Sequence, residues 1–561
     1  MFDLFVFITF FYLTLFSVIG YGLIFQSVIL KKIINFDEER VIYLGFYGLS
    51  LITFISLITS LATPHNFTHN VLLHLVGIIY LIFFKGENKK KYLKLIVLIS
   101  IIVFSALLIS KTNDDFSYYH LPFTKYLTEQ KIIFGMGHLN HGYNLLSSLF
   151  FLNSTFYLPF IKLYSFHFSL IFFLIFFNFF LIKEILLKNN HELVRFLYLF
   201  AFIYFNLSFN RLAEYGTDKV GQLLIVILII KFFHYSCLDK NKFEIKKILY
   251  LLPLLGYCIT LKTYFIPYLV LSLMIFLFDN KFINNLKKIF LSKVFFYFAL
   301  FLIIYFLHHF ISTGCLISPL PSTCFDNSFT WARDKNEIVK LSIWLEQWAK
   351  AGAGPNFRVE NVSEYIKYLN WVSNWIDKYF VGKFLDQLGI LFSCYILVYL
   401  IFKKFNVNIT EKIINKKIFL FYSLILIIFL VWFLKHPTLR YGGYSIVFLV
   451  ISFPTSYLFF KIENRKFFQK KFKYIILLVI VVFNIKNISR IDKEFKRDDI
   501  FQFSDFPYFA VKEKEYKKNF FESDFVIYQA HHCWATPSPC GHVDDNIIVS
   551  KKNGYLFIKK K

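Results

Sequence analysis

The chain contains 561 residues, of which 57% are hydrophobic and 21% are aromatic, and its mean hydropathy is +0.55. This apolar content exceeds what a soluble domain of that length needs. Apolar runs of about 18 or more residues, each sufficient to cross ~30 Å of hydrocarbon, recur along the sequence. The net charge of +26 would suit a nucleic-acid-binding protein, but most basic residues lie in short segments between apolar runs, where membrane topology requires them. We therefore expect an all-α polytopic membrane protein with no nucleic-acid partner.

Apolar runs separated by short polar segments predict about fourteen transmembrane helices. In chain order they occupy residues 4–30, 41–62, 71–84, 95–110, 157–182, 196–210, 222–237, 248–261, 264–278, 289–312, 386–402, 418–434, 445–460 and 474–489.

Lysine and arginine are distributed unevenly over the segments between these helices. Seven segments carry 29 of them, whereas the four short segments that alternate with these carry 5. Because cytoplasmic loops are enriched in these residues, the basic set is predicted to be cytoplasmic. By parity, loops 111–156 and 313–385 and the tail from residue 490 lie on the outer side. We expect a transmembrane domain over 1–489 and a small α+β extracytoplasmic domain over 490–561, with strands at FVIYQA and IIVS.

Four of the seven cysteines form two close pairs in the predicted outer segments. Cys315 and Cys324 lie in loop 313–385, and Cys533 and Cys540 lie in the tail. Two pairs on the oxidising side of a membrane favour two disulfides. The alternative for the tail is a zinc site that uses both cysteines with His531 and His532.

The polar segment from Lys111 to Asn144 interrupts the apolar runs and carries two adjacent carboxylates, Asp114 and Asp115. Charged side chains next to a membrane span are costly unless they are solvated or functional. From Asp115, positions +3, +4 and +7 share one face of a helix that Asn113 or Asp114 could cap. That face carries Tyr118, Tyr119 and Pro122. The alternative is that the two acids only cap this helix.

The sequence DDFSYYHLP, residues 114–122, together with the polytopic architecture, resembles the GT-C superfamily of membrane glycosyltransferases. The resemblance implies transfer of a sugar from a polyprenyl-phosphate donor to a glycan or lipid acceptor at the outer face of the inner membrane, with the C-terminal domain on the periplasmic side. It implies no metal and no cofactor. Asp115, which matches the acid of a D-x-x-x-Y-H pattern with Tyr119 and His120, would be the base. The stereochemical outcome is left open.

Histidines and a second acidic loop could complete such a site. His138 and His141, spaced three apart, could bind phosphate or acceptor, or be ordinary polar loop residues. In RLAEYGTDKVGQ, residues 211–222, the resemblance implies that Asp218 positions the acceptor or Asp115, with Glu214 as a neighbour. The alternative for Asp218 is an N-cap of the next helix.

Two basic residues are candidates for the donor phosphate. Lys262 lies in a tight turn between two spans, where it could bind a lipid phosphate or extend its amine to the headgroups. Arg440, in KHPTLRYGGY, offers a planar charged fork that suits phosphate oxygens. The resemblance favours phosphate binding for both, and the alternative for Arg440 is a topological anchor.

Loop 313–385 holds five of the seven tryptophans, four of them on two predicted amphipathic helices near 334–350 and 361–378. Such stripes are typical of helices that lie on a membrane surface, and a cover over a lipid groove is the functional alternative. CWATPSPC, with GTD and the D-x-x-x-Y-H pattern, also resembles a poorly characterised group of bacterial multi-span envelope proteins, which implies no reaction.

Nucleotide-binding and common hydrolase motifs are absent from the sequence, which agrees with a lipid-linked donor. Three other functions remain open: a transporter or flippase of lipid-linked glycans, an O-antigen polymerase or ligase, and a non-catalytic assembly scaffold. A transporter is expected to contain an internal repeat, and none is evident.

Overall fold

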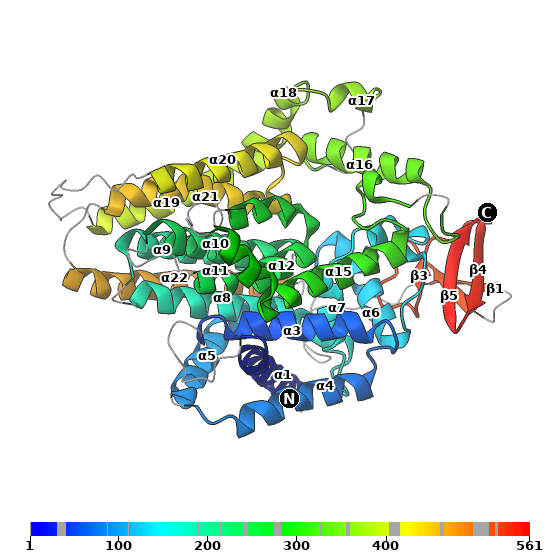
Figure 1. Cartoon of the computed structure of the whole chain (residues 1–561), viewed down its shortest axis with the longest axis horizontal. Helices are drawn as coiled ribbons and strands as arrows, with labels where there is room; N and C mark the ends of the chain where they lie inside the picture. The colour runs from blue at the N-terminus through cyan, green and yellow to red at the C-terminus, as the bar shows by residue number, and fades with distance from the viewer. Residues whose placement is uncertain are drawn as a thin grey trace.

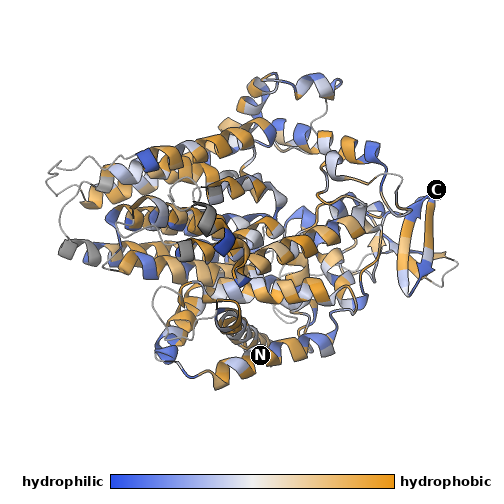
Figure 2. Ribbon diagram, viewed as in Figure 1, coloured by the Kyte–Doolittle hydropathy of each residue, from blue (hydrophilic) through white to orange (hydrophobic). Residues whose placement is uncertain are grey.

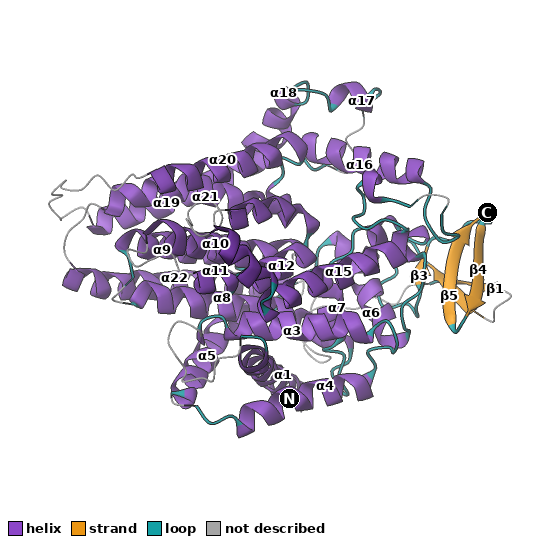
Figure 3. Ribbon diagram, viewed as in Figure 1, coloured by secondary structure: helices purple, strands orange, loops and turns teal. Residues whose placement is uncertain are grey.

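The computed structural model describes residues 2–30, 41–86, 88–109, 112–187, 190–212, 216–238, 245–273, 282–325, 328–354, 359–402, 416–460, 465–496, 515–521 and 525–561. The chain is mostly helical, and most of the long helices run along its longest axis (Figure 1). A small group of strands lies at one end of this axis, with the C-terminus (Figure 3).

Seven helical segments of the described chain are long and apolar enough to cross a membrane, which indicates a membrane protein. They are Leu4–Val28, Leu163–Leu186, Thr217–Leu238, Lys293–Thr313, Val372–Phe402, Lys416–Lys435 and Lys470–Phe495. Four shorter apolar helices of 10–17 residues accompany them, at Leu44–Thr59, Phe67–Phe83, Lys247–Leu261 and Thr263–Ser272. The described chain therefore supports fewer full-length spans than the fourteen expected, because several apolar runs form helices shorter than the ~20 residues a straight crossing takes.

Three N-terminal helices pack closely through glycines. They are α1 (Phe2–Val28), α3 (Leu44–Thr59) and α4 (Phe67–Phe83); α5 (Lys89–Val103) follows them and contains no glycine. A Cβ atom added at Gly20 of α1 would lie 1.8 Å from the carbonyl oxygen of Gly77 in α4, and one at Gly48 of α3 would lie 1.9 Å from that of Val18. Small residues allow such backbone approaches in membrane helices, where dispersion contacts replace the hydrophobic effect.

The central helices α8 (Phe168–Leu186), α9 (Glu192–Ser208), α10 (Thr217–Phe233) and α12 (Leu252–Leu261) are mostly apolar and contain the most deeply buried part of the described chain (Figure 2). They are accompanied by α15 (Lys293–Thr313) and by two short helices that carry lysines, α11 (Ile245–Leu249) and α14 (Phe282–Phe290). A 3₁₀ segment, Thr263–Leu273, follows α12 and contains Pro267. Since proline lacks a backbone donor, it disfavours a regular α-helix there.

The segment before α8 folds from short helices. They are the π-helical Phe116–His120, α6 (Leu121–Glu129), the 3₁₀ turns Met136–His138 and His141–Asn144, and α7 (Ser148–Ser154). The later helices are α16 (Lys335–Lys350), α17 (Val362–Tyr365), α18 (Val372–Trp375), α19 (Leu385–Phe402), α20 (Lys416–Lys435), α21 (Tyr444–Phe460) and α22 (Arg465–Phe495).

The expected amphipathic helix at 334–350 corresponds to α16, but the prediction of a continuous helix over 361–378 was wrong. α17 and α18 are single turns, and between them Tyr368 has a φ of +48°. The Trp371 indole donates to the Tyr368 carbonyl at 3.0 Å, and Trp371 is fully buried. Trp371 and Trp375 therefore pack in the interior, against Phe433 among others, and do not form a membrane-facing stripe.

The C-terminal strands dock on the segment that follows Asp115. β1 (Lys517–Phe521) pairs antiparallel with β2 (Phe525–Gln529), which pairs parallel with β3 (Cys540–Gly541); β4 (Ile547–Lys552) and β5 (Tyr555–Lys560) form an antiparallel pair. The expected strands FVIYQA and IIVS correspond to β2 and β4. Phe134 exchanges backbone hydrogen bonds of 2.9 Å with Leu556 and Ile558 of β5. Cys315 and Cys324 form one disulfide, and Cys533 and Cys540 form another.

Replacing Gly20 by alanine should lower the free energy of unfolding by about 1–3 kcal/mol, because α1 and α4 must separate to admit the methyl group. Gly389→Ala in α19 is the matched control, since a Cβ there meets no atom within 4 Å. Thermal unfolding in detergent can be followed with a dye that reacts with the buried thiols of Cys237, Cys258 and Cys394 as they become exposed. Equal melting temperatures for the two variants would contradict the packing described.

Candidate functional site

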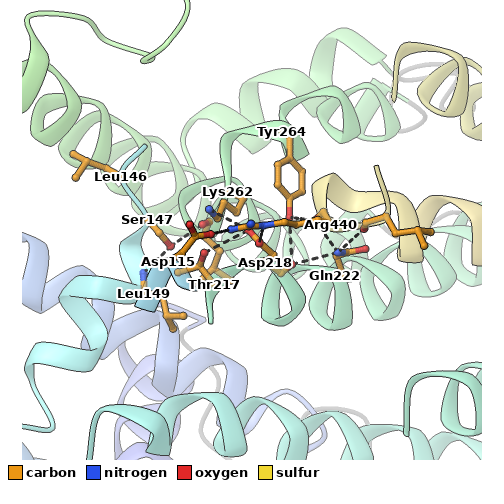
Figure 4. Close-up of polar contacts among 12 residues, drawn as sticks. Asp115, Leu146, Ser147, Leu149, Thr217, Asp218, Gln222, Lys262, Tyr264 and Arg440 are labelled. Atoms are coloured by element: carbon orange, nitrogen blue, oxygen red, sulfur yellow. Dashed lines mark hydrogen bonds and ion pairs between the residues drawn. The ribbon is translucent and has the colours of Figure 1, made fainter. Parts of the chain in front are cut away.

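One arginine joins carboxylates from two distant segments. The guanidinium group of Arg440 donates from Nη2 to Oδ2 of Asp115 and from Nε to Oδ2 of Asp218 (Figure 4). Lys262 completes the cluster, with its Nζ atom 3.1 Å from Oδ1 of Asp218. The four charges come from the segments before α6, at the start of α10, after α12 and before α21. Two acids and two bases converge in one place, and we name them the ionic cluster.

Neither acid of the ionic cluster serves as a helix cap. The Asn113 side chain accepts the Phe116 amide at 2.8 Å and so caps the first turn after Asp115, whose own side chain makes no capping bond. α10 begins after Gly216, at a φ of +60°, and Asp218 lies inside its first turn. A carboxylate there interacts favourably with the helix dipole while both its oxygens face cations. The capping interpretations of these acids therefore do not hold.

Hydrogen bonds fix the backbone that carries Arg440. Gln222 of α10 donates to the carbonyls of Leu439 and Arg440 at 3.2 and 3.1 Å and accepts from the Ser445 amide at 3.0 Å. The Tyr264 hydroxyl lies 3.2 Å from the carbonyls of Asp218 and Arg440 (Figure 4). A Cβ atom at Gly442, whose φ is +86°, would lie 3.3 Å from the Tyr264 ring. Gln222 and Tyr264 thus position the arginine.

Three aromatic side chains hold the same loop from the other side. The indole of Trp375 donates to the Pro437 carbonyl at 2.7 Å, and that of Trp432 donates to the Thr438 carbonyl at 3.0 Å. The Tyr379 hydroxyl accepts the Leu439 amide at 2.8 Å. Trp375, which sequence patterning placed on a membrane surface, therefore helps to immobilise the loop before Arg440.

The ionic cluster has a buried side and an accessible side. The side chains of Asp218 and Lys262 are 5% and 11% exposed, whereas those of Asp115 and Arg440 are 28% and 34% exposed. Burial alone would raise the pKa of Asp115, but the adjacent guanidinium outweighs burial and holds that pKa below its usual range. Asp115 is therefore ionised at neutral pH and reachable by a ligand.

Some of the other predicted site residues lie beside the ionic cluster, and others do not. His120 and Tyr119 are buried beside the ionic cluster, and burial lowers the pKa of His120 to about 3, so its imidazole is neutral. Nε2 of His120 has no hydrogen-bond partner in the described part of the chain. Asp114 is exposed and makes no ion pair among the described residues. Glu214 lies outside the described residues.

His138 and His141 are separated, although the sequence suggested a shared role. His138 Nε2 bonds to the carbonyl of Trp331 at 3.1 Å, away from the ionic cluster. His141 is exposed, and its Nδ1 lies 3.0 Å from the Tyr118 hydroxyl. The two residues belong to different 3₁₀ turns, so a spacing of three does not place them on one face.

An apolar cavity adjoins the ionic cluster. Its larger part, about 370 Å³, lies between α20, the 3₁₀ segment 263–273 and loop 317–320. A smaller part, about 120 Å³, is lined by Lys262 and shares Tyr264, His436 and Tyr441 with the larger part. Ile428, Val431 and Trp432 of α20 line its apolar wall. The cavity connects a lysine of the ionic cluster with the flank of a candidate membrane span.

Arg440→Gln should lower the free energy of unfolding at pH 7 by about 2–3 kcal/mol, because it leaves two carboxylates facing one lysine. The lowered pKa of Asp115 means that its pairing stabilises the fold above the ordinary carboxyl pKa and is lost as the pH falls through the folded value. In the variant, burial without the guanidinium raises the pKa of Asp115 instead, so the carboxylate is protonated more readily as the pH falls from 7 toward 5. The difference in free energy of unfolding between wild type and variant should therefore become smaller over this range. Melting temperatures measured across this range test the expectation.

The control for this variant is Lys496→Gln, which removes the same charge from an exposed pair with Asp492. It should cost under about 1 kcal/mol at any pH in that range. A deficit of Arg440→Gln that widens on acidification would contradict the assignment of Asp115 as an ionised partner.

No curated protein and no solved structure matches this chain. In the described residues, no group of three or more histidine, cysteine, aspartate or glutamate side chains is arranged to hold a metal ion. A family model, described as a domain of unknown function (DUF8201), matches residues 4–448. This range contains the whole ionic cluster and ends before the C-terminal strands. The chain therefore belongs to the DUF8201 family.

Proposed function

We propose that the protein is a glycosyltransferase of the inner membrane that moves a sugar from a polyprenyl-phosphate donor to a cell-envelope acceptor on the outer side. The observation that carries this proposal is the ionic cluster beside an apolar cavity: an accessible carboxylate lies with two cations that suit a phosphate, and one of these cations, Lys262, also lines the cavity. The resemblance of DDFSYYHLP to the GT-C superfamily supplies the reaction class.

In the proposed reaction, the oxygen of an acceptor hydroxyl forms a bond to the anomeric carbon of the donor sugar. The bond between that carbon and the phosphate oxygen breaks, and polyprenyl phosphate leaves with the bonding electron pair. Asp115 takes the proton of the hydroxyl as general base. Arg440 and Lys262 offset the negative charge of the leaving phosphate.

The pairing of Arg440 would couple donor binding to activation of the base. A phosphate that accepts hydrogen bonds from Arg440 competes with Asp115 for the same guanidinium edge. Asp218 retains Lys262 as a second partner, 3.1 Å away. Loss of the Arg440 contact would leave Asp115 a stronger base at the moment when the donor is in place.

The apolar cavity would take the first isoprenoid units of the donor. Its wall on α20 adjoins side chains that remain exposed on the same helix, among them Ile427, Leu430 and Leu434. A lipid tail could therefore leave the cavity toward the bilayer along this flank.

In the proposed topology, the shorter apolar helices would also cross the membrane, which would bring the number of spans closer to the fourteen expected. The basic loops would lie in the cytoplasm. The 111–156 segment and the C-terminal domain would then be periplasmic.

Asp115→Asn should abolish the transfer, with a loss of at least about 10²–10⁴ in rate, because the general base is removed without a change of shape. Mass spectrometry of surface glycans and of polyprenyl-phosphate sugars, in cells matched for protein level, should show that one sugar is lost and that its carrier-linked form accumulates. Asp377→Asn, an exposed carboxylate elsewhere in the chain, is the control. Wild-type profiles for Asp115→Asn would favour a scaffold or a flippase.

Val431→Trp should weaken binding of polyprenyl phosphate at least about tenfold, because the indole fills the cavity wall. Ile427→Trp on the same helix is the control, because this residue is similarly exposed, 51% against 44%, but does not line the cavity. Native mass spectrometry of both variants with added polyprenyl phosphate measures the effect. Equal binding by the two variants would place the lipid elsewhere.

A further inference from the structure

Five rings from three distant parts of the chain gather at the accessible side of the ionic cluster. Tyr118 and His141 come from the segment after Asp115, Trp344 comes from α16, and His531 and His532 come from the tail. We name these five residues the aromatic shelf. We propose that the aromatic shelf binds a pyranose ring of the acceptor, so that the acceptor is a glycan.

The rings of the shelf are contiguous. The Tyr118 ring centroid lies 5.1 Å from that of His141, 6.3 Å from that of His531 and 5.7 Å from that of His532. The two tail histidines are 4.8 Å apart, and Trp344 lies 5.8 Å from His141. Such spacings correspond to rings in mutual contact. The shelf is therefore one surface and not a set of separate side chains.

This surface is open to a ligand. His141 and His531 are exposed, Tyr118 and His532 are half-buried, and Trp344 is 37% exposed. Large exposed apolar side chains that cluster on one face mark interaction sites more often than singly scattered ones do. In the interior of the same region, Tyr119 and His120 are buried and belong to the core.

Asp115 borders the shelf. It precedes Tyr118 by three residues, and its charge, after burial, raises the pKa of the Tyr118 hydroxyl. Partial burial of the ring lowers the pKa of His141, although the residue as a whole is exposed. A ligand on the shelf would meet aromatic rings and then a carboxylate. That order of groups suits a substrate that must present a hydroxyl to a base.

A pyranose ring matches these groups. Its C–H face packs on aromatic rings, while its hydroxyls need both donors and acceptors, which imidazoles and a phenol supply together. The shelf carries no lysine or arginine, so it does not favour an anionic ligand such as a phosphate. A cation would need at least three suitable ligands in range, and the described residues hold no such group.

The tail holds its two histidines in place through several contacts. The Trp534 amide donates to the Ser117 carbonyl at 3.0 Å, and Ser117 Oγ lies 2.9 Å from Nδ1 of His532. The Tyr143 hydroxyl donates to the Cys540 carbonyl at 2.7 Å, and Cys540 is linked to Cys533 beside the histidines. Because the family match ends at residue 448, part of the acceptor surface would lie beyond the matched region.

The test uses the full-length protein in lipid nanodiscs and a mixture of methyl glycosides of glucose, galactose, mannose and N-acetylglucosamine. Saturation-transfer NMR should show transfer to the ring protons of at least one of them. Trp344→Ala and His531→Ala should each lower the signal at least about fivefold, whereas Trp344→Phe should retain it. Phe520→Ala, which removes a 76% exposed aromatic ring from β1, is the matched control.

The proposal rests on the proposed function for its assignment of the acceptor, and the two fail differently. Asp115→Asn should still bind the glycosides. If this variant binds them and cells that make it have an unchanged glycan profile, the transferase proposal is overturned and the proposal of the aromatic shelf stands. If the wild-type protein gives no saturation-transfer signal on any of the four glycosides, the proposal of the aromatic shelf is overturned and the transferase proposal is not affected. Tight zinc binding in calorimetry that His531→Ala abolishes would also overturn it, as a metal site.

Discussion

The double pairing of Arg440 is the constraint on which the site depends. One guanidinium group satisfies carboxylates that lie 325 and 222 residues earlier in the chain. Removing any one of these charges would leave an uncompensated partner in a poorly solvated place, which is costlier than losing a surface pair. Hydrogen bonds from Gln222 and Tyr264 fix the backbone of Arg440, and one from Trp432 fixes that of Thr438, two residues earlier. The charges therefore face one another before any ligand binds.

Sequence reasoning could name the charged residues but not their convergence. Asp115, Asp218, Lys262 and Arg440 each adjoin an apolar run, where a charge is costly enough to signal a role. Their meeting depends on how helices pack over hundreds of residues, which local patterns do not encode. Gln222 was missed because an uncharged amide in VGQLLIV gives a weaker signal, although any polar side chain in such a run needs a partner. For His138 the sequence left two roles open, because a three-residue spacing does not show which way each side chain faces when the backbone is unknown; in the structure His138 bonds to the Trp331 carbonyl.

Hydropathy identified the helical class, whereas the described residues contain seven helices of full spanning length and leave the prediction of fourteen spans unconfirmed. An apolar run predicts burial, and a partly buried 3₁₀ segment such as 263–273 has a composition similar to that of a span. The tryptophans show the same ambiguity. Trp371 and Trp375 have helical spacing, but the turn at Tyr368 breaks the helix and both indoles pack inside, whereas Trp344 on the intact α16 stays exposed. The composition of a segment therefore predicts whether its side chains are buried better than it predicts which secondary-structure element the segment forms.

Under the proposed function, the pairing within the ionic cluster also bears on which acid would act. Both cations are already paired with carboxylates, so a donor phosphate would compete with a carboxylate for at least one of them. Asp218 has two cationic partners and is nearly buried, whereas Arg440 is the cation paired with Asp115 among the described residues. Water can better offset the loss of the guanidinium contact at Asp115, whose side chain is 28% exposed, than at Asp218, whose side chain is 5% exposed. Under the proposed function, Asp115 would therefore release Arg440 to the phosphate, and Asp218 would keep its contact with Arg440.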